Sequence, residues 1–376
     1  MSITGEEQQE KQSTGAWAKA RAWGLAVFQG VVAVFGFVIG LHWITRQDLA
    51  DFLAFWGAGG RVLASQSPYG YYPTLNGGSV FQSVPWLAWL FAPLALLPVG
   101  RAWQIFYLLN LLLVALTILL AFKEFRIRLN PLAATLVLAC SLALAYPCLS
   151  FGQVSILQAA ILSLMALALQ RGRPVLAGAL MPLALLKPHL LLWFIPYVLI
   201  TGGRRFRLAS LASTLLLALV ALVFQPSWPG EMLQTILAGQ AGTRMETWKY
   251  TTLSGLFSLD PKLGLLIPIV FLPVLFWLSR RIKDYPLYSR LAIVLGFSLA
   301  ASPYSFSYDL PLLLPALVWL TQQWPARTTL LWTAVAVLIY LLGFQNLAYL
   351  VTLLVCGLIL FTLNRRQPSL ALEVVA

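Results

Sequence analysis

The chain is poor in charge, and poorest in acid. Only 10% of its 376 residues are charged, 60% are hydrophobic, and Asp and Glu together number 12. Because soluble domains carry about 25% charged residues, this composition excludes an ordinary soluble protein. It also excludes a disordered or collagen-like chain. The long apolar stretches instead predict an all-α, polytopic membrane protein with one domain.

Cysteine and histidine are also scarce. The three cysteines, Cys140, Cys148 and Cys356, all lie in apolar runs, which argues against a disulfide framework. The two histidines show no zinc-ligand spacing, and no Asp-x-Asp motif occurs. The sequence therefore predicts no metal site and no cofactor.

Basic residues dominate what charge there is, with a net charge of +13. They lie in clusters between the apolar runs, which favours membrane topology over nucleic-acid binding, because loops rich in Lys and Arg stay in the cytoplasm. Placing every cluster inside puts both termini in the cytoplasm. The first apolar run lacks a cleavage site and is read as a retained helix. Together these patterns predict a multi-pass protein of a bacterial inner membrane.

About ten apolar runs approach the roughly 20 residues that a spanning helix needs. They would form one transmembrane domain, residues 23–364, between cytoplasmic segments 1–22 and 365–376. External loops are expected at 45–83 and 226–254. The candidate spans are 24–44, 102–122, 130–148, 154–170, 206–225, 255–279, 288–303, 309–323, 328–343 and 346–363.

Two apolar segments do not fit simple spans. Residues 174–203 lie between two basic clusters, so they must enter and leave on the same side, and they are too short for two full spans. We expect a re-entrant hairpin of two half-membrane helices that meet at Lys187-Pro188, with a single Pro-kinked span as the alternative. Residues 84–98 are too short to span and predict a half-helix in the outer leaflet.

The first external loop begins with a candidate catalytic helix. Leu49, Leu53, Trp56, Gly60 and Leu63 recur at helical spacing and predict one apolar face. Asp51 would lie almost opposite that face, with Asp48 on the same side, so both carboxylates could face a cavity of the protein. The alternative is that Asp48 caps the helix and Asp51 is a solvated charge.

Lys187 and His189 stand at the centre of the predicted hairpin. An ionisable residue at membrane depth is costly and indicates function by default. A lysine at such a tip suits a phosphate, and the alternative is a carboxylate partner that supports folding.

Other polar groups lie in the external connections. Each has a structural alternative: a turn, a helix-start charge, an interfacial anchor or ordinary loop surface. The candidates that could bind substrate are Tyr69, Gln153, Arg244, Lys249, Tyr304, Tyr308 and Asp309, and Arg61 ends the first external helix.

Four short segments together resemble glycosyltransferase family 87. They are Asp51-Phe52 followed by Pro68-Tyr69, the Gly152-Gln153 turn, Ala177-Gly178 with Lys187-Pro188, and Ser302-Pro303-Tyr304 leading to Tyr308-Asp309. Each is weak alone, but their order and spacing cover roughly residues 45–320. Many members carry a histidine in the Ser-Pro segment. This chain has Ser307-Tyr308-Asp309 there, so no histidine role is carried over.

The resemblance implies a helical bundle of the GT-C class and an inverting transfer on the external face. A hexose, mannose first, or a related sugar would move from a polyprenyl-phosphate donor to a lipid or glycan acceptor. Asp51 matches the family's general base. Lys187, Arg61 and His189 are the expected donor-phosphate ligands. A transporter or lipid flippase is the main alternative, and a non-catalytic scaffold is a second.

Overall fold

The described part of the molecule is almost entirely helical. The computed structural model describes residues 50–72, 79–127, 129, 131–242, 250–257, 259, 261–264, 266–328, 330–332, 334–335 and 349–365. One short antiparallel pair, β1 (Tyr71–Tyr72) and β2 (Ser79–Val80), is the exception. The helices are α2 (Ala50–Leu63), α3 (Pro85–Ala95), α4 (Val99–Glu124), α5 (Pro131–Phe151), α6 (Ser155–Gln170), α7 (Pro174–Ala179), α8 (Met181–Ala184), η1 (Pro188–Leu191), α9 (Phe194–Thr201), α10 (Gly203–Phe224), α11 (Trp228–Gly242), α12 (Leu253–Leu256), α13 (Pro261–Gly264), α14 (Ile267–Val270), α15 (Leu272–Arg281), α16 (Leu287–Ala300), η3 (Ser307–Leu313), α17 (Leu314–Gln323), η4 (Pro325–Arg327) and α19 (Tyr349–Arg365).

Three of the described helices are long and apolar enough to cross a membrane. They are α4, α5 over residues 133–151, and α10. Leu216, Leu219 and Val223 on α10 are 62%, 58% and 78% exposed, which suits contact with lipid rather than water. The expected spans 24–44 and most of 328–343 lie outside the described residues. Helices α6, α16 and α19 coincide with expected spans but are shorter, so the total of about ten stays a prediction.

The expected span 255–279 is wrong as a continuous helix. The chain there forms four short helices, α12 to α15. Prolines stand at the starts of three of them, at Pro261, Pro268 and Pro273. Because proline lacks an N–H and clashes with the preceding turn, it favours the first turn of a helix and interrupts a longer one.

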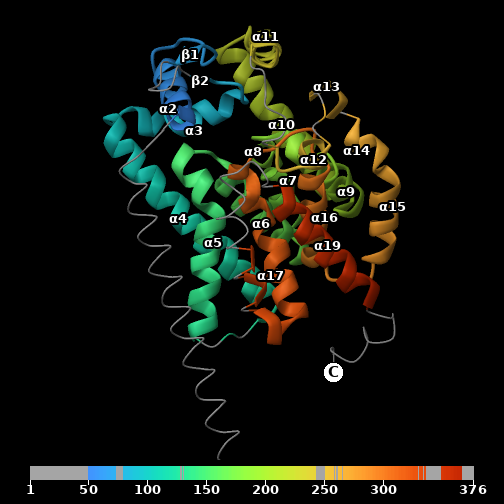
Figure 1. Cartoon of the computed structure of the whole chain (residues 1–376). Coiled ribbons are helices and arrows are strands. Elements are labelled where there is room, and N and C mark those ends of the chain that lie inside the picture. Colours follow the sequence, from blue (N-terminus) through green and yellow to red (C-terminus); the bar gives the residue numbers. More distant parts are fainter. Residues whose placement is uncertain are drawn as a thin grey trace, which may run out of the picture.

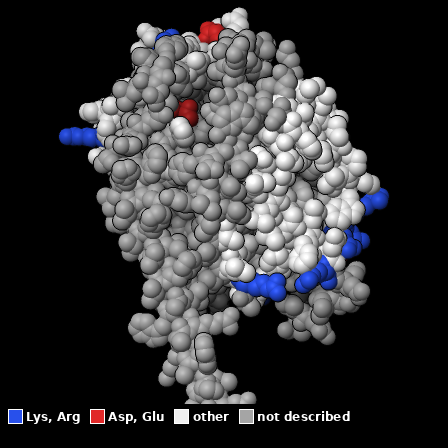
Figure 2. Space-filling model, viewed as in Figure 1, with Lys and Arg blue, Asp and Glu red and all other residues white. Residues whose placement is uncertain are grey.

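Two apolar cores hold the fold together. The larger joins α4 to α7, α9, α16, α17 and α19, and the smaller joins α2, α3, β2 and the start of α4. Figure 1 shows α2 and the β-pair beside α11 at one end, from which α4 and α5 run toward the other. In Figure 2, blue atoms gather mainly along the lower and right edges of the face shown, whereas red atoms lie in its upper half.

Residues 174–201 form a broken helical segment that folds back along α10. A Cβ atom on Gly178 would lie 2.6 Å from Ala209 Cβ, so α7 lies in close contact with α10. At the other end, Arg207 Nη1 donates to the Leu199 carbonyl at 3.2 Å. Both ends therefore lie against the first half of α10, and the chain between them carries Lys187.

The predicted apolar face of α2 is wrong, although the helix is present. Phe52, Phe55 and Ala58 are the buried side chains, at 0%, 8% and 0% exposure, whereas Leu63 is 49% exposed. The aromatic rings bury more apolar area than the leucines, and α3 and α4 supply their partners. Asp51 therefore lies next to the buried face rather than opposite it.

Candidate functional site

Asp51 is positioned by an aromatic cluster beneath α2. The ring of its neighbour Phe52 lies 5.1 Å from Trp103 and 5.4 Å from Phe106, centroid to centroid. Such aromatic pairs contribute about 0.5–1.5 kcal/mol each beyond their burial. Asp51 itself is half-buried in the first turn of the helix. The anchored ring fixes the carboxylate at the edge of the smaller core.

Gly152 brings the turn between α5 and α6 against α2. Its φ of +71° lies in the left-handed region, where residues with a Cβ are strained. A Cβ there would lie 2.4 Å from Phe52 Cβ and 2.8 Å from Trp103 Cζ3. Both the conformation and the space require glycine. The Gly152-Gln153 turn, which leads into α6, therefore contacts α2 next to Asp51.

Lys187 lies in a buried polar cluster built from three separate segments. Its Nζ donates to Asp309 Oδ1 at 2.7 Å and to Ser155 Oγ at 3.0 Å. Ser155 Oγ in turn donates to Asp309 Oδ1 at 2.5 Å. The side chains of Lys187 and Asp309 are 13% and 2% exposed. A buried charge needs such compensation, and Asp309 provides it for Lys187.

Asp309 also lies in the first turn of η3. Its Oδ2 accepts a hydrogen bond of 3.0 Å from the backbone N–H of Phe306. The two roles expected for Asp309, lysine partner and helix-start charge, therefore occur together, one on each oxygen. Both carboxylate oxygens are engaged, which fixes the orientation of the group that Lys187 faces.

The broken backbone at Lys187 is held by side chains from neighbouring elements. Gln158 Nε2 donates to the carbonyls of Ala184 and Lys187, at 2.8 and 3.3 Å. Ser83 Oγ donates to the Leu186 carbonyl at 3.0 Å. These bonds satisfy carbonyl groups that the interruption releases from helical pairing. The position of the lysine is therefore determined by tertiary contacts.

Tyr308 lies beside the Lys187 ammonium group. Lys187 Nζ is 4.5 Å from its ring centroid. Burial, and after it the nearby charges of Asp51 and Asp309, raises the pKa of the Tyr308 hydroxyl. The Gly152 turn contacts Phe52 beside Asp51, and the neighbouring Phe151 ring lies 5.9 Å from the Tyr308 ring, centroid to centroid. Asp51 and Lys187 therefore lie near one region, although they are far apart in the sequence.

Aromatic and amide groups border the same region. His189 stacks on Tyr304 with ring centroids 4.2 Å apart and an angle of 19° between planes. Gln153 is 6% exposed, and its Oε1 has no hydrogen-bond partner among the described residues. Ser302 Oγ lies within hydrogen-bonding distance of the His189 carbonyl, at 3.0 Å. Stacked rings and an available acceptor are groups that can bind a sugar.

Two candidates have local structural contacts instead. Arg61 Nε donates to the Ser67 carbonyl at 2.5 Å. The Tyr69 hydroxyl donates to the Ser83 carbonyl at 3.0 Å, and burial raises its pKa. Both hold the loop that follows α2. Asp48, Arg244 and Lys249 lie outside the described residues.

Ser155 and Ser83 contact the site but were not among the predicted site residues. Ser155 follows Gly152-Gln153 by two residues and begins α6. The short polar link that contains Ser155 was the sequence feature that could have identified it as a site residue. Ser83 had none, because its partner Leu186 lies on a distant segment and offers only a backbone carbonyl.

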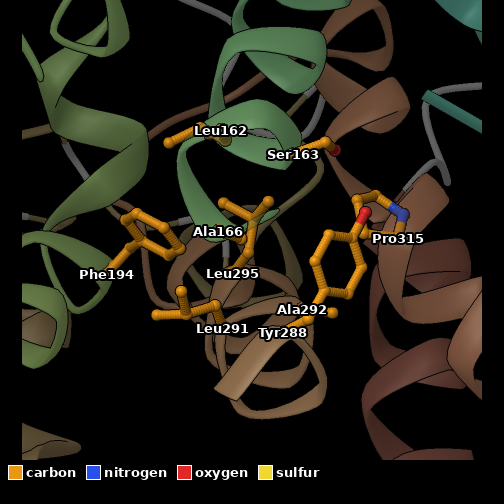
Figure 3. Close-up of a pocket in the computed structure, with 9 residues that line it drawn as sticks. All are labelled: Leu162, Ser163, Ala166, Phe194, Tyr288, Leu291, Ala292, Leu295 and Pro315. Atoms are coloured by element: carbon orange, nitrogen blue, oxygen red, sulfur yellow. The ribbon is translucent and has the colours of Figure 1, made fainter. Parts of the chain in front are cut away.

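A small cavity elsewhere in the bundle is not part of this region. Its volume is about 10 Å³, and its lining includes Ser163, Phe194 and Tyr288 (Figure 3). A single water needs roughly 10–15 Å³ by this measure, so the cavity cannot hold a sugar. The part of the structure that is described contains no cluster of residues able to hold a metal ion.

Comparison with known proteins gives one match. The family model of glycosyltransferase family 87 matches residues 84–303. Searches of curated proteins and of solved structures found no match. The matched range includes the Gly152 turn, the Lys187 segment and the start of the Ser302 segment.

Proposed function

The chain belongs to glycosyltransferase family 87, and we propose that it transfers a hexose, mannose first, from a polyprenyl-phosphate donor to a lipid or glycan acceptor. Family membership makes the chain a glycosyltransferase. The donor, acceptor and stereochemistry are our proposal. It is supported by one arrangement: the α5–α6 turn contacts Phe52 beside Asp51 through Gly152 and contacts Tyr308 through Phe151, and Lys187 Nζ lies 4.5 Å from the ring centroid of that same tyrosine.

Asp51 is proposed as the general base. In the reaction an acceptor oxygen forms a bond to the anomeric carbon while the bond from that carbon to the phosphate oxygen breaks. The hydroxyl proton passes to a carboxylate, and a positioned base contributes about 10²–10⁴-fold to such a step. A single displacement inverts the anomeric carbon and needs no second carboxylate as nucleophile. One half-buried aspartate beside the site suffices.

Lys187 is proposed to bind the donor phosphate. The leaving polyprenyl phosphate takes the bonding electron pair, so its developing charge needs a nearby cation. An ammonium group has three N–H donors, and Asp309 and Ser155 accept from Lys187. One donor is left for a phosphate oxygen. His189 stacks on Tyr304, and this pair of rings would lie beside the phosphate or the sugar of the donor.

Gln153, Tyr304 and Tyr308 are proposed to contact the sugar. The free Oε1 of Gln153 can accept from a sugar hydroxyl, and the aromatic rings offer faces for its C–H groups. Asp48, Arg244 and Lys249 remain predicted contacts from the external loops. Arg61 is more simply a support for the loop after α2, since its guanidinium is engaged by Ser67.

The membrane setting fits a lipid-linked donor. We propose that the site opens on the external face of a bacterial inner membrane, with both termini in the cytoplasm. Helix α3 and the broken segment 174–201 would border the path of a prenyl tail from the outer leaflet. Trp86 on α3 donates to the Pro182 carbonyl at 2.9 Å, so these two elements adjoin each other beside Lys187.

The test is sugar transfer by the full-length protein in purified membranes. Radiolabelled polyprenyl-phosphate mannose and a panel of other lipid-linked sugars are supplied, and labelled lipid or glycan is measured. We expect transfer from at least one donor by the wild type and a loss of about 10²–10⁴-fold in Asp51→Asn. Full activity in a folded Asp51→Asn variant contradicts the assignment of the base. Failure with every donor contradicts the donor class.

A further inference from the structure

A groove that contains two arginines lies between the ends of α17 and α19. Its volume is about 260 Å³. It is separate from the proposed active site, because η3 with Asp309 precedes α17 whereas the groove lies where α17 ends. The groove is lined by Gln323, Trp324, Pro325, Arg327, Phe361 and Arg365.

The groove offers two arginines that have no acidic partner in the described structure. The ion pairs among the described residues are Arg171–Glu124 and Lys187–Asp309, and neither includes Arg327 or Arg365. The Arg365 guanidinium lies over the Phe361 ring, 4.2 Å from its centroid. This stacking orients the guanidinium before any ligand arrives, and its planar fork matches two phosphate oxygens.

The surroundings indicate a lipid rather than a soluble anion. Phe361, which lines the groove, is 42% exposed, so the groove surface includes an apolar aromatic side chain. Trp324 contacts Phe361 edge to face at 5.9 Å, and tryptophan favours the boundary between lipid and water. A volume of about 260 Å³ admits a headgroup, and acyl chains would stay on the outer faces of the helices.

The groove also lies at the basic end of the molecule. Gln322 Nε2 donates at 3.0 Å to the carbonyl of Phe125, which follows the end of α4. Near that end Arg171 and Glu124 pair at 2.7 Å. The charge pattern assigns this end to the cytoplasmic side, where anionic lipids attract basic residues by about 1 kcal/mol each.

We propose that this groove binds the headgroup phosphate of an anionic phospholipid of the inner leaflet, with Arg327 and Arg365 as its ligands. Such a site would fix α17 to α19 at the membrane surface. The proposal does not depend on the sugar donor or on the assignment of Asp51, since the groove shares no residue with that site.

The experiment is native mass spectrometry of the full-length protein in detergent, titrated with phosphatidylglycerol or phosphatidylcholine. The double variant Arg327→Gln/Arg365→Gln is compared with Arg173→Gln/Arg204→Gln, which removes the same charge from exposed positions outside the groove. We expect phosphatidylglycerol to bind the groove variant roughly tenfold more weakly, with little change in the control variant. Phosphatidylcholine should bind all proteins weakly.

Three outcomes would overturn the proposal. They are equal weakening in the groove and control variants, binding of phosphatidylcholine as tight as that of phosphatidylglycerol, and release of the lipid by millimolar inorganic phosphate. The last would identify a site for a free anion. If the glutamine variant does not fold, Arg327→Lys/Arg365→Lys decides. Lysine keeps the charge but not the fork, so affinity must fall, and wild-type affinity would contradict the assignment.

Discussion

The two sides of the proposed active site are built in different ways. The Asp51 side is apolar: Phe52 packs among Trp103, Phe106 and Phe91, and Gly152 allows the close approach. The Lys187 side is polar: an ion pair, a serine and several bonds to backbone carbonyls hold an interrupted helix. The apolar side keeps a carboxylate accessible, whereas the polar side compensates a buried cation. Under the proposed function, the Asp51 side would accept the acceptor's proton, and the Lys187 side would bind the charged phosphate of the donor.

Removing the acid from the polar side should have the largest effect on stability. Asp309→Asn leaves Lys187 buried without a counter-charge and should lower the free energy of unfolding by roughly 3–5 kcal/mol. Thermal unfolding of the purified protein measures this. The double variant Lys187→Met/Asp309→Asn, in which no charge is left unpaired, should recover much of the loss. A double variant less stable than the single one would contradict the account.

On the apolar side, Gly152→Ala should have the next largest effect. The positive φ costs about 1–3 kcal/mol for a residue with a Cβ, and the contact with Phe52 must also open. Because the strain displaces α2, transfer activity should fall together with the melting temperature. Gly172→Ala is a matched control, since its φ is +66° but a Cβ there meets nothing within 4 Å. The account requires a greater loss of activity at Gly152 than at Gly172.

The smallest effect is expected away from both sides, at Glu231 on α11. Burial acts to raise its pKa, but hydrogen bonds from Ser227, Ser67 and Gln225 together lower it. A lowered pKa means that these bonds stabilise the fold above the ordinary glutamate pKa of about 4.3 and are lost as pH falls through the folded value.

Glu231→Gln should therefore lower the melting temperature slightly at pH 7, and the difference from wild type should shrink toward pH 4. Thermal unfolding at the two pH values checks this. The same difference at both pH values would show that charge on Glu231 does not hold the loop that Ser67 belongs to.

Sequence patterns anticipated the elements better than their contacts. Helices α4, α5 and α10 follow from long apolar runs, and the interruption at Lys187-Pro188 is visible in the sequence. The buried face of α2 was assigned wrongly, because Phe52 and Phe55 find aromatic partners on α3 and α4 that spacing alone does not reveal. The prolines in 255–279 were a signal against a continuous span.

Contacts between distant segments limited how much of the candidate site could be predicted from the sequence. Asp309 was a possible partner of Lys187, but the sequence alone cannot show that the two side chains meet. Their contact depends on how α6, η3 and the broken segment pack together. The packing of the same three segments also brings Ser155 into the site. A tertiary contact between segments that are distant in the sequence has no local pattern.

The most direct test of the division between the two sides separates donor binding from transfer. The dissociation constant of the lipid-linked donor and the single-turnover rate are measured for wild type, Asp51→Asn and Lys187→Met. Asp51→Asn should bind the donor with wild-type affinity and lose about 10²–10⁴-fold in rate. Lys187→Met should bind it roughly tenfold more weakly or worse. Unchanged donor affinity in a folded Lys187→Met variant, or weakened affinity in Asp51→Asn, would contradict the account.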